Sequence, residues 1–261
     1  MEKEVQTDVT KNIENIETQR IEPTQLEVVQ NDALTIEEIE TGLVYNGSMV
    51  RVADISEEFR KVIEPILRMY NAAMNVTTAR IEIIKDESRY KNVRCPVHHI
   101  DTRLKSAGSI LGKLQKKNLD LTIGAACNNI YDIAGVRIVC PYIKDVYFIR
   151  DRILAQDDIE VMKVKDYIEH PKENGYRSYH LIIRVPVFFI NKKQMVPVEI
   201  QIRTMAMDLW ASLEHDISYK AINSKGKYQG DYSEFREELT ECSRLIYEAE
   251  EKMERMNSML E

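Results

Sequence analysis

The amino-acid sequence predicts an α/β fold, with long helices near both ends of the chain and a sheet formed by the residues between them. Apolar residues recur every three or four positions from Phe59 to Ile84, which is the period of a helix with one buried face. Between Val196 and Arg203, apolar and polar residues alternate strictly, as in a strand with one buried face. Apolar residues at helical spacing among many charges over 231–260 predict a second long helix.

The remaining elements follow from similar local patterns. We expect helices over residues 54–86, 102–118, 144–156, 204–221 and 231–260, and strands near 136–140, 159–168, 179–190 and 196–203. Pro65 is expected to kink or divide the first helix, and Thr204 to cap the fourth. The expected domains are an acidic, flexible extension (1–50, with a short helix near 36–43), a main folded domain (51–230) and a C-terminal helix (231–261). That last helix either packs on the domain or pairs with another subunit.

The negative charge is concentrated near the N-terminus. Residues 1–45 carry 11 acidic and 3 basic side chains, a net charge of −8, whereas the whole chain has −7 and the remainder therefore +1. A balanced body argues against a broad duplex-DNA interface, which needs a basic face, but it allows a small anionic ligand.

The sequence also predicts where the protein resides. No stretch approaches the roughly 18–20 apolar residues that a membrane span needs, and the first residues lack the segments of a secretion signal. The four cysteines are widely spaced and form no CxxC motif, which favours reduced thiols and a cytoplasmic protein. We expect no metal site at Cys95, His98 and His99, because no second ligand pair has zinc-site spacing.

Residues 165–180, KDYIEHPKENGYRSYH, combine groups that bind a phosphorylated aromatic ligand. Asn174-Gly175 predicts a tight turn ahead of the strand near 179–190, so this polar loop lies at the end of a rigid sheet. The competing interpretation is a charged surface hairpin. The candidate ligand-binding side chains are the cations Lys165, Lys172 and Arg177, the flat ring of Tyr176 and the donor His180.

The helix expected over 102–118 has five basic residues and no acidic one. In a helix, Arg103, Ser106, Ser109 or Ile110, and Lys113 would follow one side in steps of three or four residues. Such a face suits a polyphosphate, and the alternative is a solvated basic face. We favour the polyphosphate because no acidic residue offsets the repulsion among the cations. The five are Arg103, Lys105, Lys113, Lys116 and Lys117.

Two carboxylates stand on or beside expected strands. Asp132 is at the entrance of the strand near 136–140, and Glu199 lies on the polar face of the strand over 196–203, beside Gln201 and Arg203. On neighbouring strands the two carboxylates would meet over the sheet, opposite the basic helix, as a magnesium–nucleotide site requires. A solvated strand face would have the same pattern. The chain contains neither a P-loop nor a GxGxxG motif, which excludes those two nucleotide-binding classes. The carboxylates, the basic helix and the aromatic loop together suit two nucleotides, one with Mg²⁺ and one presenting a nucleophile.

Four runs in this order resemble the RelA/SpoT-type (p)ppGpp synthetase domain: YDIAGVRIVC, VKDYIEHPKENGYRSYHL, VEIQIRT and MDLWASLEH. The resemblance covers about residues 55–255 and is strongest to the synthetase-only form, the small alarmone synthetases. It implies a mixed, largely antiparallel sheet of the nucleotidyltransferase type, flanked by helices. It also implies a Mg²⁺-dependent transfer of the β,γ-diphosphate of ATP to the 3′-hydroxyl of GDP or GTP, with release of AMP. Residues 51–230 would then be the catalytic domain, in a homotetramer.

The same resemblance assigns roles by position. Asp132 and Glu199 match the Mg²⁺ and catalytic acids, and Glu199 also matches the residue that helps to deprotonate the 3′-hydroxyl. Tyr176 matches the residue that stacks on guanine. Asp208 falls where some members have Asn, and its carboxylate can accept from two guanine N–H groups, which adenine cannot offer. The ATP-binding residues are Arg103, Lys105, Ser109, Lys113 and Arg137, with Arg103 and Arg137 beside the adenine. The GDP/GTP-binding residues are Lys165, Lys172, Tyr176, His180, Gln201 and Asp208.

Acceptor choice and competing functions remain open at this point. Residues 163–166, KVKD, resemble the basic form of a motif linked to acceptor choice, which favours GDP. No hydrolase activity is expected, since the chain has no room for the hydrolase domain of longer members and His215-Asp216 lies inside an expected helix. One alternative is an enzyme of the same fold with an adenine-nucleotide or RNA acceptor. The other is an inactive module that binds a nucleotide or RNA.

Overall fold

The structure is a computed structural model that describes residues 57–223 and 232–260. The acidic extension, the short helix expected near 36–43 and the first residues of the helix expected over 54–86 lie outside these ranges. The helices are α3 (Glu57–Tyr90), α4 (Ala107–Lys116), α5 (Ile123–Asn129), α6 (Ile143–Leu154), α7 (Met205–Asn223) and α8 (Tyr232–Ser258). The strands are β1 (His99–Leu104), β2 (Ala134–Cys140), β3 (Glu160–Asp166), β4 (Tyr179–Phe188) and β5 (Lys193–Thr204).

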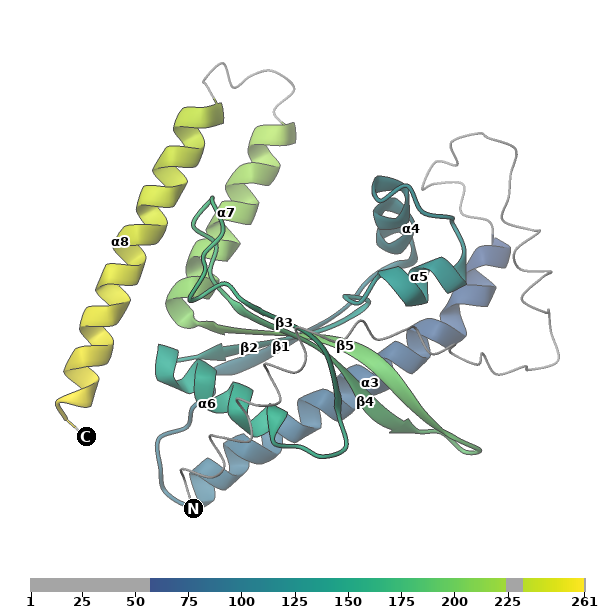
Figure 1. Cartoon of the computed structure of the whole chain (residues 1–261), viewed down its shortest axis with the longest axis horizontal. Helices are drawn as coiled ribbons and strands as arrows, with labels where there is room; N and C mark the ends of the chain where they lie inside the picture. The colour runs from purple at the N-terminus through teal and green to yellow at the C-terminus, as the bar shows by residue number, and fades with distance from the viewer. Residues whose placement is uncertain (1–56, 224–231, 261) are drawn as a thin grey trace.

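The five strands form one open sheet in the order β1-β2-β5-β4-β3 (Figure 1). β2 and β5 run parallel, whereas the other three neighbouring pairs are antiparallel. This confirms the mixed, largely antiparallel sheet with flanking helices. The register sets Gly135 of β2 opposite Glu199 of β5, and His180 of β4 opposite Gln201. Because β2 is parallel and β4 antiparallel to β5, the turn before β2 lies toward the start of β5 and the loop before β4 toward its end, with Glu199 and Gln201 between them.

The two faces of the sheet differ in polarity, as the alternation in β5 predicted. Val198, Ile200 and Ile202 are fully buried in the core. Helices α3 and α6 cover this apolar face (Figure 1). Glu199 and Gln201 point to the opposite face. Over that polar face, α4 and α5 stand on one side and α7 on the other (Figure 1).

One expected helix is partly wrong. Residues 102–104 belong to strand β1, and α4 begins only at Ala107. Arg103 therefore lies on a strand that pairs with β2, not on a helical face shared with Lys113. Ser106 is the N-cap of α4 and accepts a hydrogen bond from the backbone N–H of Ser109. Backbone pairing of six residues along β2 outweighs the helical tendency of a short polar segment.

The three long helices α3, α7 and α8 correspond to helices predicted from the sequence. Pro65 lies inside α3 without dividing it. Thr204 caps α7, because its Oγ1 accepts from the backbone N–H of Met207 at 3.1 Å. Helix α8 packs beside α7 (Figure 1). Over the described ranges, none of the helices has the length and apolar character needed to cross a membrane.

Candidate active site

Asp132 lies in the turn before β2 and is held by two lysines. Its Oδ2 is 2.7 Å from Lys113 Nζ, on α4, and 3.1 Å from Lys105 Nζ, just after β1. Burial raises the pKa of Asp132, but the two ammonium groups outweigh burial and hold this pKa below its usual value. The carboxylate is therefore ionised at neutral pH, and the lysines form a cationic edge beside it.

Glu199 projects from the middle of β5 and is also held in its charged form. Its Oε1 lies 3.2 Å from His180 Nδ1, and its Oε2 accepts from Gln201 Nε2 at 3.1 Å. Burial raises the pKa of Glu199, and the negative charge of Asp132 acts in the same direction. The hydrogen bonds from His180 and Gln201 outweigh both effects and hold this pKa below its usual value. The two carboxylates are separated by 66 intervening residues in the sequence. The parallel β2–β5 pair brings them close enough for the charge of Asp132 to affect the pKa of Glu199.

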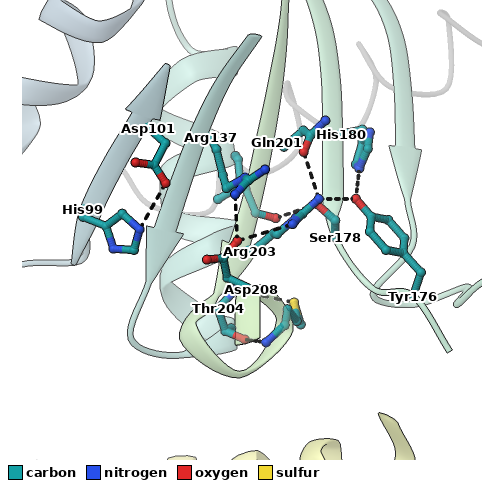
Figure 2. Close-up of polar contacts among 12 residues, drawn as sticks. His99, Asp101, Arg137, Tyr176, Ser178, His180, Gln201, Arg203, Thr204 and Asp208 are labelled. Carbon is teal, nitrogen blue, oxygen red and sulfur yellow. Dashed lines mark hydrogen bonds and ion pairs between the residues drawn. The ribbon is translucent and has the colours of Figure 1, made fainter. Parts of the chain in front are cut away.

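A chain of hydrogen bonds leads from Glu199 through His180 to Tyr176. Figure 2 shows the bond between His180 and Tyr176. Burial lowers the pKa of His180, so its ring is neutral at neutral pH. A neutral ring that donates from Nδ1 to Glu199 must accept at Nε2, which lies 2.8 Å from the Tyr176 hydroxyl. That hydroxyl in turn accepts from Arg203 at 2.6 Å. The direction of every bond in the chain is then fixed by its charged ends.

Arg203 lies at the centre of the polar face (Figure 2). It is only 6% exposed, and it donates to Gln201 Oε1 at 2.9 Å and to Ser178 Oγ at 3.4 Å. Its NH1 is 3.3 Å from Asp208 Oδ1, and Arg137 NH1 reaches the same oxygen at 3.3 Å. The side chains of Arg137 and Asp208, which were assigned to different nucleotides, therefore meet between β2 and α7.

The acceptor loop, defined as residues 167–178, has an aromatic and cationic inner surface. The Tyr176 ring meets Tyr167 edge-on, with ring centroids 6.0 Å apart. Lys172 Nζ lies 4.7 Å from the centre of the Tyr167 ring and 4.6 Å from that of Tyr176. Lys165 Nζ is 5.8 Å from the Tyr167 ring. The turn expected at Asn174-Gly175 is present, with Gly175 at φ +84°.

The remaining predicted ATP-binding residues lie toward the β1 edge. Arg103 is exposed on β1, and Ser109 is exposed on α4, where its hydroxyl is 2.9 Å from that of Ser106. Lys105 and Lys113 join them at Asp132. The predicted residues therefore form two groups, one near β1 and α4 and one near β4 and the acceptor loop, with the carboxylates between them.

The donor set fits a divalent cation shared with a ligand. Asp132 Oδ1 is buried and has no hydrogen-bond partner among the described residues, which leaves a carboxylate oxygen available. Over the described ranges, no three His, Cys, Asp or Glu residues gather as a complete metal site. Two carboxylates without further protein ligands match the way Mg²⁺ is bound together with phosphate oxygens.

Three side chains in this network were not predicted as site residues. Arg203 was placed on the polar face of its strand but given no role, although it contacts Tyr176, Gln201 and Asp208. Tyr167 and Ser178 are the first and last residues of the acceptor loop, where Tyr167 contacts the Tyr176 ring and Ser178 accepts from Arg203. A signal was available for Arg203, because an arginine two residues from Gln201 on a half-buried strand needs buried partners. We find no such signal for Ser178.

Comparison with known proteins identifies the family. Residues 102–224 match the region found in RelA/SpoT proteins. The chain is 42% identical over 187 residues to GTP pyrophosphokinase YwaC of Bacillus subtilis (strain 168), covering 72% of this chain and 86% of the relative. It is 35% identical over 157 residues to GTP pyrophosphokinase YjbM of the same organism, covering 60% of this chain and 73% of the relative.

A solved structure shares the fold. Small alarmone synthetase 1 from Bacillus subtilis, in a crystal structure bound to its product pppGpp, matches with a TM-score of 0.67 and 28% identity. The match covers 78% of this chain and 99% of that one. Together with the five-stranded sheet and the residue pattern around Asp132 and Glu199, these similarities show that the chain belongs to the RelA/SpoT family, among its small alarmone synthetases.

Proposed function

We propose that this protein is a (p)ppGpp synthetase that transfers the β,γ-diphosphate of ATP to the 3′-hydroxyl of GDP or GTP. The observation that carries the proposal is the placement of Asp132, just before β2, and Glu199, on the neighbouring parallel strand β5, between a lysine pair and an aromatic loop. Relatives named GTP pyrophosphokinase, and a similar structure bound to pppGpp, support the same reaction.

In the proposed reaction, Glu199 takes the proton of the acceptor 3′-hydroxyl. A bond forms between that oxygen and the β-phosphorus of ATP, and the bond from this phosphorus to the oxygen of the α-phosphate breaks, so that AMP leaves. Glu199 suits a base because its carboxylate is ionised at neutral pH. The bonds from His180 and Gln201 hold its two oxygens in place.

The lysines and arginines are proposed to hold the donor. Lys105 and Lys113 neutralise phosphate charge that develops during transfer. Arg103 and Ser109 bind phosphate oxygens of ATP, and Arg137 stacks on adenine. Asp132 and Glu199 would hold Mg²⁺, which would supply positive charge to offset that of the ATP phosphates.

The acceptor is proposed to bind on the other side of the carboxylates. Tyr176 stacks on the guanine base, Asp208 accepts from its N–H groups, and His180 and Gln201 position the ribose. Lys165 and Lys172 bind the acceptor phosphates. We further propose that the enzyme acts in the cytoplasm as a homotetramer, that residues 51–230 form its catalytic domain, and that residues 231–261 form a C-terminal helix.

The decisive experiment is an incubation of the purified protein with Mg-ATP and GDP, GTP, AMP or no acceptor. Nucleotides are separated by anion exchange, and products are identified by ³¹P NMR. We expect AMP release that depends on GDP or GTP, together with a new 3′-diphosphate signal. Glu199→Gln, prepared in parallel, should release no AMP and thereby excludes a contaminating enzyme.

The other outcomes identify the alternatives. AMP release with AMP as the acceptor would show an adenine-nucleotide acceptor and overturn the guanine assignment. Nucleotide binding without AMP release under any condition would show a binding module. AMP release that persists after chelation of all divalent cations would contradict the proposed Mg²⁺ site.

A further inference from the structure

Helix α8 touches the backbone of the acceptor loop next to Tyr176. Ser243, on α8, donates its hydroxyl to the carbonyl oxygen of Gly175 at 2.6 Å. Ser243 is only 6% exposed, and this contact joins residues that are 68 positions apart. Figure 1 shows α8 beside α7, on the side of the sheet where the acceptor loop lies.

The hydrogen bond acts on the peptide unit that carries Tyr176. The Gly175 carbonyl and the Tyr176 N–H belong to one planar peptide group. Ser243 holds the oxygen of this group, and Asn174 Oδ1 accepts from its N–H at 3.2 Å. With both ends bonded, the plane cannot rotate without breaking a contact, so the direction of the Tyr176 side chain is limited.

The fit between α8 and the loop leaves no room for a side chain at position 175. A Cβ on Gly175 would lie 2.6 Å from Ser243 Cβ and 3.5 Å from the backbone Cα of Thr240. Gly175 also has a positive φ of +84°, which other residues rarely adopt. The loop backbone is therefore seated directly on α8.

Further contacts between α8 and its neighbours surround this point. Thr240 Oγ1 donates to the carbonyl oxygen of Glu173 at 3.3 Å. The Arg177 guanidinium lies 3.6 Å from the centre of the Tyr247 ring. Trp210 of α7 meets the Tyr176 ring edge-on at 6.5 Å, and its Nε1 donates to Leu239 O on α8 at 3.0 Å. Helix α8 thus contacts the loop on both sides of Tyr176 and also the aromatic residue behind it.

We propose that α8 is part of the acceptor site and that Ser243 is a positioning residue, which sets the orientation of Tyr176 through the Gly175 carbonyl. This inference rests on the proposed acceptor role of Tyr176. Helix α8 lies beyond residues 102–224, the part that matches the family region. The contacts at Gly175 give it a function distinct from the oligomerisation predicted for it from the sequence.

The test compares Ser243→Ala with Ser258→Ala in the full chain. Both remove a serine hydroxyl from α8, but the Ser258 hydroxyl is exposed and bonds within the helix, to Glu254 O at 3.0 Å. KM is measured for GDP at saturating Mg-ATP and for ATP at saturating GDP. For Ser243→Ala we expect KM for GDP to rise about two- to tenfold, the usual effect of one lost hydrogen bond, with KM for ATP unchanged. Ser258→Ala should leave both values as in the wild type.

A second measurement does not depend on turnover. Amide hydrogen exchange of peptides covering residues 174–177 should be faster in Ser243→Ala and unchanged in Ser258→Ala. Thr240→Val, at an exposed position of the same helix, should raise the KM for GDP by a smaller factor, because its bond to the loop is longer. It provides a test even if Ser243→Ala folds poorly.

The outcomes separate this inference from the proposed function. Wild-type protein that turns over GDP, together with a Ser243→Ala variant whose KM for GDP and loop exchange are unchanged, would overturn the role of Ser243 alone. A lower melting temperature and kcat, with both KM values unaltered, would likewise overturn it, since that pattern indicates a structural role. If the wild type releases no AMP, the proposed function fails before the variant is assayed.

Discussion

The Tyr176 hydroxyl and His180 Nε2 lie 2.8 Å apart, and the other ring nitrogen of His180 contacts Glu199. The residue proposed to hold the guanine base is thereby joined to the proposed general base through a single imidazole. A change at either end of this link should alter binding and chemistry to different extents. The ring of Tyr176 and its hydroxyl can therefore be tested separately.

Tyr176→Ala removes the stacking ring, and Tyr176→Phe removes only the hydroxyl. Because stacking of a base on an aromatic ring contributes about 1–3 kcal/mol, we expect Tyr176→Ala to raise KM for GDP by roughly 5- to 100-fold. Tyr176→Phe should mainly lower kcat, as His180 loses the donor at Nε2. Tyr90→Ala, at an exposed position of α3, is the control. Equal increases in KM for ATP and GDP would argue against the stacking role.

Asp132→Asn should remove turnover and keep the fold. An amide cannot provide the negative charge that balances a divalent cation, so we expect kcat/KM to fall by a factor on the order of 10² to 10⁴. Circular dichroism and thermal melting check the fold, and a Mg²⁺ titration checks the cause. Asp157→Asn, at an exposed turn position before β3, should behave like the wild type. Near-normal activity of Asp132→Asn would refute the metal assignment.

Arg203→Lys should weaken the acceptor site selectively. A lysine ammonium cannot reach Tyr176, Gln201 and Asp208 together, as the planar guanidinium does. We expect a higher KM for GDP, an unchanged KM for ATP, and a loss of unfolding free energy of about 1–3 kcal/mol from the unpaired buried groups. Arg68→Lys, on the exposed side of α3, serves as the matched control. An unaltered KM for GDP would show that the network does not orient the acceptor residues.

Glu250 should make stability depend on pH. It is 4% exposed on α8, and burial raises its pKa to about 7. Because this folded-state pKa exceeds the ordinary value of 4.5, the folded protein binds more protons than the unfolded chain between these pH values. The stabilisation from protonated Glu250 is therefore complete below about pH 4.5 and is lost as pH rises through about 7.

Glu250→Gln removes this dependence, so the variant should be more stable than the wild type at pH 8, by up to about 3 kcal/mol, and equally stable near pH 4.5. Denaturant unfolding at several pH values measures the difference. Glu238→Gln, exposed on the same helix, should show no such crossover. Parallel stability curves for Glu250→Gln and the wild type would mean that Glu250 is ionised in the folded protein.

The sequence was most informative where one face of an element is buried. Strand β5 could be predicted because Val198, Ile200 and Ile202 alternate with polar residues, and the structure buries these three completely. Glu199 was located for the same reason. Strand β1 has no fully buried residue, and only Ile100 and Leu104 pack against the core, so the strand depends mainly on pairing with β2, which is not visible in the sequence. The error at Arg103 follows directly from this.

Roles that depend on contacts between distant segments also could not be predicted. Arg203 was visible as a polar residue on β5, but its contacts with Tyr176 and Asp208 depend on how β4 and α7 meet. Ser243 was one of many polar residues on a helix expected to pack or to pair. Its contact with Gly175 spans 68 positions and needs the folded arrangement of α7 and α8.

The strand order arranges the proposed functions across the width of the sheet. Arg103 lies on β1, Asp132 precedes β2, Glu199 lies on β5, His180 on β4 and Lys165 on β3, which is also the spatial order of the strands. Arg103, proposed for the donor, and Lys165, proposed for the acceptor, therefore lie on opposite edge strands, whereas Arg137 and Asp208 meet between β2 and α7. Substitutions at one edge can change which nucleotide is used there while the chemistry and the opposite substrate are retained. New acceptor preferences are thus accessible through β3, β4, their loop and Asp208 of α7, without changes at the β1 edge.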